Sequence, residues 1–310
     1  MKKSRISIII PTYNRPVLLK RALNSIFRAI APSGFEKEII VVDNGDSDET
    51  FITMQRFLSE HRTELFYYKI SQKGPSAARN FGLQKSKGDY IMFIDDDDEI
   101  NYSLFKTLDE ISVSPDRPLI ILLGFCFIYH LGRIILNRRK PSRSFLPVWQ
   151  RPIAVGSVFT RNVFVKHRIC FDEKLVHLED LDLSIRCDIK GIRIISINEP
   201  LYSCHVEMPW RKNSLTKGDF ERLLQDTQYF CRKHYQYYAS HGPKALAFLN
   251  YLKGMAYAKL GQFQKARVHL SKARQLDPEI KYRSSYFLTY LGSRGFTAGR
   301  YLYFLLKMLT

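Results

Sequence analysis

Three short apolar runs lie within the first hundred residues, and each ends abruptly in polar turn residues. They occupy residues 6–10, 38–42 and 90–94 and are rich in β-branched side chains. Such runs are typical of strands that are buried on both faces. Between the first two, apolar residues recur at helical spacing: Leu18, Leu19, Ala22, Leu23, Ile26 and Phe27. The pattern predicts strand, helix, strand, with parallel strands and a right-handed crossover.

The third run leads directly into five carboxylates, Asp95 to Glu99. So many adjacent like charges repel one another unless a counter-ion holds them. In open α/β sheets, ligands collect at the carboxyl ends of the strands, which is where this cluster is expected. Hard cations prefer oxygen ligands and also bind phosphates, so the pattern predicts a Mg²⁺ or Mn²⁺ site. A solvated acidic loop is the alternative reading of such a charge run.

The second run ends in a similar polar loop, residues 43–48. Asp43 follows the strand directly, and we expect it to contact a ligand. Asp46 and Ser47 precede a predicted helix at about residues 49–61, and for these two residues we expect only a helix-capping role.

Four motifs follow one another in this region: residues 7–14 (SIIIPTYN), 41–48 (VVDNGDSD), 74–82 (GPSAARNFG) and 93–98 (FIDDDD). Together they resemble the inverting family-2 glycosyltransferases of the GT-A fold. Each motif is weak alone, but their order within 100 residues makes the resemblance specific. It continues through 156–159, 177–181 and 200–202 and covers about residues 4–207. The resemblance implies an α/β domain with a Rossmann-like, mostly parallel central sheet flanked by helices.

The resemblance also implies a binding site for a nucleotide-sugar donor. Asp43 would bind the base, Arg79 would contact the nucleotide, and Asp95 with Asp97 would form an Asp-x-Asp motif for metal and diphosphate. Mg²⁺ or Mn²⁺ there would stabilise the charge on a departing nucleoside diphosphate. Which of the four consecutive aspartates coordinates the metal stays open. The residues expected to contact the donor are Pro11, Tyr13, Asp43, Arg79, Asp95 and Asp96.

A catalytic base is expected at Glu179 and Asp180. Apolar residues recur every three or four positions from Leu178 to Ile189, and Gly191 supplies a stop, so Asp180 should lie in the first turn of a helix. Carboxylates there also stabilise a helix through its exposed amides and dipole, which is the alternative reading. The resemblance implies that Asp180 is the general base for an acceptor hydroxyl group and that Glu179 supports it.

The sequence departs from the family pattern after residues 200–202. Relatives often continue with Arg, any residue and His, whereas this chain has Ser203, Cys204 and His205. The histidine is kept and the arginine is not. A lone histidine near a strand end is more often structural; His205 is also a candidate to approach the metal or the diphosphate as the acceptor loop closes.

Length and composition predict two domains. The resemblance implies that the first, residues 1–215, is GT-A-like, and the change of pattern after it predicts a helical region at 216–310. A chain of 310 residues with 45% hydrophobic residues can bury a substantial core. The longest apolar run, residues 119–129, contains Gly124 and is too short to span a membrane, so it predicts a buried strand. The apolar run after Met1 stops at Pro11, which does not fit a signal peptide. Five cysteines without a Cys-x-x-Cys pair favour reduced thiols in the cytoplasm.

The C-terminal region has the spacing of a tetratricopeptide repeat between residues 247 and 280. The residues that carry the spacing are Gly254, Tyr257, Gly261, Phe263, Ala266, Ala273 and Pro278. They predict one helix pair, residues 246–260 and 263–276. A single repeat cannot bury its own face, so flanking helices at about 220–240 and 282–310 or the catalytic domain should cover it. We expect an internal cap; a protein partner bound through these helices is the alternative.

The formal net charge of +18 is concentrated in two blocks. Residues 211–310 hold 18 Lys and Arg against 5 Asp and Glu, and residues 117–171 hold ten basic residues and no acid. Such blocks attract anionic membranes or phosphates. Nucleic acid is not an expected partner, because no helix-turn-helix, zinc finger or aromatic RNA-binding strand is present. The apolar residues 301–309 are either buried in the helical cap or laid on a membrane.

Together these features predict an inverting, metal-dependent glycosyltransferase peripheral to the cytoplasmic face of the membrane. It would move a sugar to a hydroxyl group of a glycan or lipid-linked glycan, in the synthesis of polysaccharide, lipopolysaccharide or lipid-linked oligosaccharide. A sugar nucleotidyltransferase is one alternative, although residues 11–16 are not the glycine-rich loop that it needs. A non-catalytic helical-repeat adaptor is the other, against which the intact Asp95, Asp97 and Asp180 argue.

Overall fold

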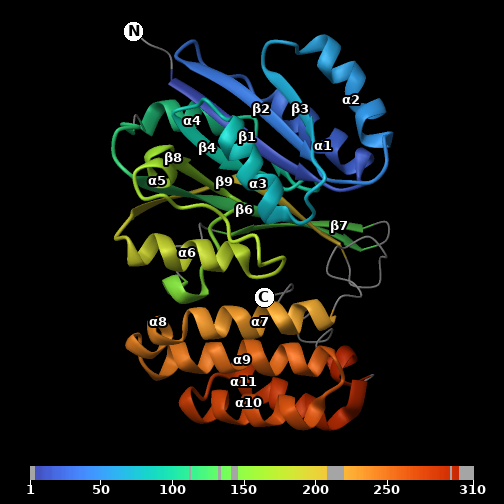
Figure 1. The fold of residues 1–310 in the computed structure, drawn as a ribbon, viewed down its shortest axis with the longest axis vertical. Coiled ribbons are helices and arrows are strands. Elements are labelled where there is room, and N and C mark those ends of the chain that lie inside the picture. Colours follow the sequence, from blue (N-terminus) through green and yellow to red (C-terminus); the bar gives the residue numbers. More distant parts are fainter. Residues whose placement is uncertain are drawn as a thin grey trace. The chain divides into compact units, whose positions relative to one another are not determined.

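The chain folds into two compact units (Figure 1). The sheet unit comprises Met1–Glu173 with Glu179–Lys212, and the helical unit comprises Lys174–Leu178 with Asn213–Thr310. The segment Lys174–Leu178, which the sequence placed in the first domain, therefore belongs with the helices. The computed structural model describes residues 4–111, 113–131, 134–140, 146–207, 220–293 and 295–299.

The sheet unit is built on one mixed sheet with the strand order β3-β2-β1-β4-β8-β6-β9-β5, and β7 pairs with β6. Its strands are β1 (Ser4–Thr12), β2 (Phe35–Asp43), β3 (Leu65–Lys69), β4 (Tyr90–Phe93), β5 (Glu99–Ile100), β6 (Leu119–Leu131), β7 (Ile134–Lys140), β8 (Ser157–Thr160) and β9 (Arg193–Glu207). Its helices are α1 (Pro16–Arg28), α2 (Glu49–Glu60), α3 (Pro75–Lys85), α4 (Leu104–Ile111), α5 (Asn162–Val165) and α6 (Glu179–Ile189), with a short 3₁₀ turn at Val148–Gln150.

The sheet is parallel where the first three apolar runs lie and mixed beyond them. β3, β2, β1 and β4 pair in parallel, whereas β8 runs antiparallel to both β4 and β6. β6 therefore points the same way as β4, and it pairs in parallel with β9. The α/β class and the helical C-terminal region are confirmed. The expectation of a mostly parallel sheet holds for the first four strands of the order and gives way to mixed pairing after them.

The two faces of the sheet hold separate hydrophobic cores, which explains the continuous apolar runs. Ile6, Ile8 and Ile10 of β1 belong to one core, together with residues of α1, α2 and α4. Ile9 points to the opposite face and belongs to the other core, together with residues of α3, α5 and α6. Because successive side chains of a strand alternate between faces, a strand covered on both sides needs apolar residues throughout.

The helical unit contains α7 (Phe220–Lys233), α8 (Tyr235–Ser240), α9 (Pro243–Lys259), α10 (Phe263–Leu276), α11 (Ile280–Leu288) and a 3₁₀ turn, Thr289–Leu291. The predicted pair corresponds to α9 and α10. A Cβ atom at Gly254 would lie 2.6 Å from the Leu270 side chain, so the small residue lets the two helices approach closely. Ala266, Leu270 and Phe296 form part of the core of this unit. The apolar residues 301–309, and residues 141–145 within the second basic block, lie outside the described part of the chain.

In the portion of the chain that the structure describes, helices are too short or too polar to cross a bilayer.

Candidate functional site

The parallel strands bring three polar loops to one end of the sheet. Thr12 at the end of β1 is in register with Asp43 at the end of β2, and Ile9 is in register with Phe93 at the end of β4. The acidic loop that follows β4 therefore lies beside the end of β1. Thr12 Oγ1 donates a hydrogen bond of 2.7 Å to Asp96 Oδ2 and fixes this arrangement.

The acidic loop contains a cluster of carboxylates suited to a cation. Oxygen atoms of Asp95, Asp97 and Asp98 lie within 4.8 Å of one another. Burial and the neighbouring carboxylates raise the pKa of Asp97 and of Asp98. A divalent cation would offset both effects, because hard cations take several carboxylate oxygens. The donor set therefore fits Mg²⁺ or Mn²⁺, with Asp98 added to the predicted Asp95 and Asp97.

Asp96 has a different environment from the other three aspartates. Its side chain is fully buried and pairs with the Arg15 guanidinium at 2.6 Å. Burial raises the pKa of Asp96 to about 7, although Arg15 opposes that rise. Arg15 also pairs with Asp97 at 3.0 Å. Asp96 thus holds the loop against β1 and α1, and its predicted contact with the donor stays a prediction.

Arg79 links the acidic loop to Glu179, the predicted support of the catalytic base. It lies on α3, and its side chain is 5% exposed. One terminal nitrogen pairs with Asp95 Oδ1 and the other with Glu179 Oε1, both at 2.8 Å. A forked guanidinium suits two carboxylates, each held by its own nitrogen. The sequence predicted a nucleotide contact for Arg79, and the structure places it between two acidic motifs 84 positions apart.

Glu179 and Asp180 lie in the first turn of α6, as predicted. Glu179 is largely buried, and burial raises its pKa to about 7, while Arg79 lowers it and Asp180 raises it. Asp180 is half-buried, and its Oδ1 accepts a hydrogen bond of 2.7 Å from the Leu181 amide. The two neighbouring carboxylates therefore differ in environment: Glu179 is tied to Arg79, and Asp180 lies at the free amides of the helix start.

Asp43 lies buried at the end of β2. Tyr67 donates a hydrogen bond of 2.6 Å to Asp43 Oδ2, and the Gly45 amide donates one of 2.8 Å to Oδ1. Burial, followed by the bond to Asp43, raises the pKa of Tyr67, so the tyrosine remains a donor. These contacts orient the carboxylate that the sequence assigned to the base of the nucleotide.

Tyr13 and Asp46 meet in the neighbouring loops. Tyr13 donates a hydrogen bond of 2.7 Å to Asp46, and Lys73 pairs with Asp46 and lies over the Tyr13 ring at 5.3 Å. The expectation that Asp46 caps α2 is wrong, because its carboxylate binds these two residues instead. Ser47 Oγ does accept a hydrogen bond of 3.1 Å from the Glu49 amide at the helix start. Pro11 precedes this loop as a residue of β1.

His205 on β9 lies next to the acidic loop. Its Nε2 is 2.7 Å from Glu99 Oε1, and its backbone amide donates to Asp98 Oδ1 at 3.0 Å. Tyr202 donates a hydrogen bond of 2.6 Å to the other oxygen of Asp98. β9 therefore orients Asp98, and a metal contact by the His205 side chain remains a prediction.

Several functional contacts were missed from the sequence. Arg15 was noted only within the loop of residues 11–16, Tyr67 carried no prediction, and Tyr202 was noted only within the stretch 200–202 of the resemblance. One signal was available in the sequence: Arg15 is a basic residue next to Asn14 in the loop after β1, and this loop was expected to lie near the acidic loop after β4. In the structure Asn14 has a positive φ of 51°, and its side chain accepts the amides of Asp46 and Ser47.

Comparison with known families agrees with this geometry. The family "Glycosyl transferase family 2" matches residues 7–115, and the tetratricopeptide repeat family matches residues 247–280. We call the sheet unit the family-2 domain, after the family that its residues 7–115 resemble. The residues matched include the ends of β1, β2 and β4 and Arg79 on α3.

Two characterised relatives match this family-2 domain over short stretches. The GalNAc(5)-diNAcBac-PP-undecaprenol beta-1,3-glucosyltransferase of Campylobacter jejuni is 35% identical over 105 residues, 34% of this chain and 33% of that protein. The poly(ribitol-phosphate) beta-N-acetylglucosaminyltransferase TarS of Staphylococcus aureus is 29% identical over 102 residues, 33% of this chain and 18% of that protein. The matched segment spans a third or less of each relative.

Solved structures extend the likeness of fold beyond the family-2 domain. S. aureus TarS 1-349, solved in complex with UDP, aligns with a TM-score of 0.53 at 17% identity over 90% of each chain. The mannosyltransferase PcManGT of Pyrobaculum calidifontis, in complex with GDP-Man and Mn²⁺, aligns with a TM-score of 0.56 at 18% identity over 97% of this chain and 87% of that one. These similarities establish the GT-A fold.

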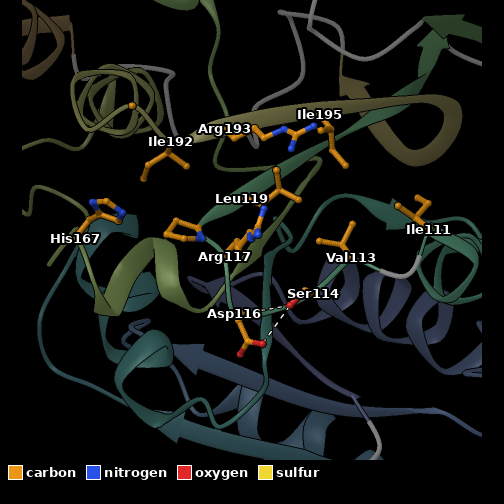
Figure 2. Close-up of a pocket in the computed structure, with 12 residues that line it drawn as sticks. Ile111, Val113, Ser114, Asp116, Arg117, Leu119, His167, Ile192, Arg193 and Ile195 are labelled. Carbon is orange, nitrogen blue, oxygen red and sulfur yellow. Dashed lines mark hydrogen bonds between the residues drawn. The ribbon is translucent and has the colours of Figure 1, made fainter.

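A separate hollow of about 950 Å³ lies at the opposite end of the strands (Figure 2). Leu119 and Arg193, the first residues of β6 and β9, line it together with Arg117, His167 and aliphatic side chains. Because β6 points the same way as β4, its first residue lies at the end of the sheet away from the acidic loop. This hollow is therefore distinct from the carboxylate site of the family-2 domain.

Proposed function

We propose that the protein is an inverting glycosyltransferase that moves a sugar from a nucleoside-diphosphate sugar to a hydroxyl group of a glycan. The observation that carries the proposal is the bridge from Asp95 through Arg79 to Glu179. It joins a carboxylate cluster suited to a metal and a diphosphate to a helix start that bears a second pair of carboxylates. An inverting transfer needs both elements, one for the leaving group and one for the attacking hydroxyl.

The donor would lie along the ends of β1, β2 and β4. Asp43 accepts hydrogen bonds from Tyr67 and Gly45, so its carboxylate is oriented to accept one from an N–H group of a nucleobase. Asp95, Asp97 and Asp98 would hold Mg²⁺ or Mn²⁺, and the cation would neutralise charge on the departing diphosphate. Mn²⁺ and GDP-Man occur in the structure of PcManGT, and UDP occurs in that of TarS. A hexosyl or N-acetylhexosaminyl donor is consistent with these neighbours.

Asp180 would act as the general base. Glu179 is held by Arg79 and largely buried, whereas Asp180 accepts the Leu181 amide in the first turn of α6, where the helix dipole favours a carboxylate. In the reaction, Asp180 takes the proton of the acceptor hydroxyl while that oxygen attacks the anomeric carbon. The bond from that carbon to the diphosphate oxygen breaks, and the configuration at the carbon inverts. Glu179 would fix the helix start through Arg79.

The acceptor would be a glycan or a lipid-linked glycan at an anionic membrane. The relative from C. jejuni carries a PP-undecaprenol-linked acceptor in its name. The two basic blocks of this chain would favour a peripheral position on the cytoplasmic face, since each basic residue near an anionic bilayer contributes on the order of 1 kcal/mol. A protein partner on the C-terminal helices would be compatible with the tetratricopeptide-like pair.

The test is a screen of nucleotide sugars with Mn²⁺ or Mg²⁺ that follows the release of nucleoside diphosphate. One donor should give release that rises with a glycan or lipid-linked acceptor and stops in excess chelator. A folded protein that releases no nucleoside diphosphate from any donor would contradict the proposed activity. Salt-sensitive co-sedimentation with anionic liposomes, and none with neutral ones, would support the membrane position.

A further inference from the structure

The helical unit holds five residues that come from the middle of the sheet unit's sequence. Lys174–Leu178 belong to the helical unit, whereas Glu173 before them and Glu179 after them belong to the sheet unit. Leu178 is joined by one peptide bond to Glu179, the first residue of α6. The position of the proposed catalytic carboxylates is therefore covalently linked to a segment that the C-terminal helices hold.

Asp226 on α7 binds this segment. Its side chain is 3% exposed, and Oδ2 accepts hydrogen bonds from the backbone amides of Val176 at 3.1 Å and His177 at 3.0 Å. The His177 ring contributes a third contact, from Nδ1 at 3.0 Å. A buried carboxylate that takes three such contacts fixes both the backbone and one side chain of the segment.

Arg222, one turn earlier on α7, completes the contact. Its Nε lies 2.9 Å from Asp226 Oδ1, and a terminal nitrogen donates a hydrogen bond of 2.7 Å to the Lys174 carbonyl. Burial raises the pKa of Asp226, but the contacts with His177 and Arg222 lower it by more, so the pKa lies below its usual value. Asp226 is therefore charged at neutral pH. We call Asp226, Arg222 and the bound Lys174–Leu178 the α7 clamp.

The residues on either side of the clamped segment, Glu173 and Glu179, make contacts within the sheet unit. On one side, Glu173 accepts hydrogen bonds from Gln72 at 2.6 Å and Asn80 at 2.7 Å. On the other side, Glu179 pairs with Arg79. Leu178, between the clamp and Glu179, has a φ of +65°, which is unfavourable for a leucine. Such a conformation persists only where the surroundings enforce it, and here an anchor lies on either side.

We propose that Asp226 is a positioning residue for sugar transfer: by holding Val176 and His177 it fixes the start of α6 and hence the Asp180 carboxylate. This inference rests on the proposed function, in which Asp180 is the general base. The effect would pass along the chain, through Leu178, to Glu179 and Asp180. Donor binding depends on Asp43, Asp95 and Asp97 of the sheet unit, so it should not depend on the clamp.

The test compares Asp226→Asn with Asp277→Asn in the full chain. The first substitution keeps the size of the side chain but removes the charge that pairs with Arg222. Asp277 is also a buried aspartate of the helical unit, but its Oδ1 accepts the Glu279 amide before α11 and does not contact Lys174–Leu178. The control therefore reports the effect of losing a buried carboxylate in the same unit.

Three measurements decide the proposal. Hydrogen exchange followed by mass spectrometry should show faster exchange in residues 174–184 of Asp226→Asn, with no such change in Asp277→Asn. Binding of UDP or GDP with Mn²⁺, by calorimetry, should change less than twofold in both variants. The turnover number should fall at least tenfold in Asp226→Asn, and Asp226→Glu should recover part of it. A residue that only stabilises the fold would lower the melting temperature and leave turnover per folded molecule unchanged.

The outcomes separate this inference from the proposed function. Unchanged exchange in residues 174–184, faster exchange throughout α7–α11, or equal loss of turnover in Asp277→Asn would overturn the clamp. If the wild type transfers no sugar, the proposed activity fails, but exchange and nucleotide binding still decide whether Asp226 fixes the start of α6. If Asp226→Asn does not fold, His177→Ala, which removes only the ring contact, should show the same pattern in smaller measure.

Discussion

The two acidic motifs of this protein are held in different ways. The loop of Asp95 to Asp98 is fixed within one unit, by Thr12 and Arg15 on one side and Tyr202 on the other. Glu179 at the start of α6 pairs with Arg79 within the sheet unit, and it follows directly in the chain on Lys174–Leu178, a segment that Asp226 holds within the helical unit. In the proposed mechanism the donor end of the site is thus built into the sheet, whereas the acceptor end would also be affected by the α7 clamp.

This difference suggests a division of roles. A site for a charged leaving group gains from rigid, preorganised electrostatics, because the charge to be stabilised develops in one place. A base must instead meet an acceptor hydroxyl group that arrives separately, and its position determines the rate more than the binding of the donor. Substitutions in the two motifs should therefore separate donor binding from turnover.

The largest effect is expected at the acidic loop. Asp97→Ala removes one of the three carboxylates within 4.8 Å of one another, so metal-dependent nucleotide binding and turnover should both be lost. The fold should persist, because relief of like-charge repulsion compensates for the lost Arg15 contact. Calorimetry with UDP or GDP and Mn²⁺, together with circular dichroism, checks this. Full activity of the variant, or of the wild type in excess chelator, would remove the metal from the mechanism.

A large but more selective effect is expected at α6. Asp180→Asn keeps the shape and the helix start but removes the proton acceptor, so turnover should fall by roughly 10² to 10⁴, the usual contribution of a general base. Nucleotide binding should change little. The matched control is Glu179→Gln. If that variant is the crippled one and Asp180→Asn is mild, the two roles are reversed.

The sequence predicted the parts of the fold that depend on local pattern. The apolar runs at β1, β2, β4 and β6 and the pair α9 and α10 are confirmed, because two-sided burial and close helix packing restrict residue types along the chain. The start of α6 at Glu179 followed from periodicity. The motif residues that end β1, β2 and β4 converge at one end of the sheet, as parallel pairing requires.

The remaining contacts depend on tertiary structure. Arg79 was recognisable as a motif residue, but its bridge between Asp95 and Glu179 arises only when α3 and α6 pack beside β4. The clamp by Asp226 joins residues 49 and 50 positions apart and has no local signature, since an aspartate in the middle of an amphipathic helix reads as a solvated residue. The mixed pairing of β8 was likewise invisible, because a short apolar run carries no direction.

A smaller effect is expected when the link between the two acidic motifs is weakened. Arg79→Lys keeps the charge but cannot bind two carboxylates in a fork, so one buried charged hydrogen bond is lost. The free energy of unfolding should fall by about 2 kcal/mol, the scale for hydrogen bonds to charged groups, and turnover should also fall. Urea denaturation measures the change as a shift in midpoint with an unchanged slope.

The control for Arg79 is Arg5→Lys, at a pair with Glu36 in which both side chains are 42% exposed. Solvent screens that pair, so its midpoint should not move measurably. Equal shifts in the two variants would show that the buried bridge has no special importance for linking the motifs.

The smallest effect is expected away from both motifs, in the helix pair. Gly254→Ala would place a Cβ atom 2.6 Å from Leu270 Cγ, so α9 and α10 must move apart or Leu270 must shift. Overpacking typically costs about 1–3 kcal/mol, and the better helix propensity of alanine offsets up to about 1 kcal/mol, so a net loss of about 1 kcal/mol is expected. Leu270→Val makes room for the new methyl group, and in that background Gly254→Ala should cost less. Nucleotide binding should be unchanged in all of these variants, because the proposed donor site lies in the sheet unit. A loss of nucleotide binding would mean that the helices also affect the donor end of the site.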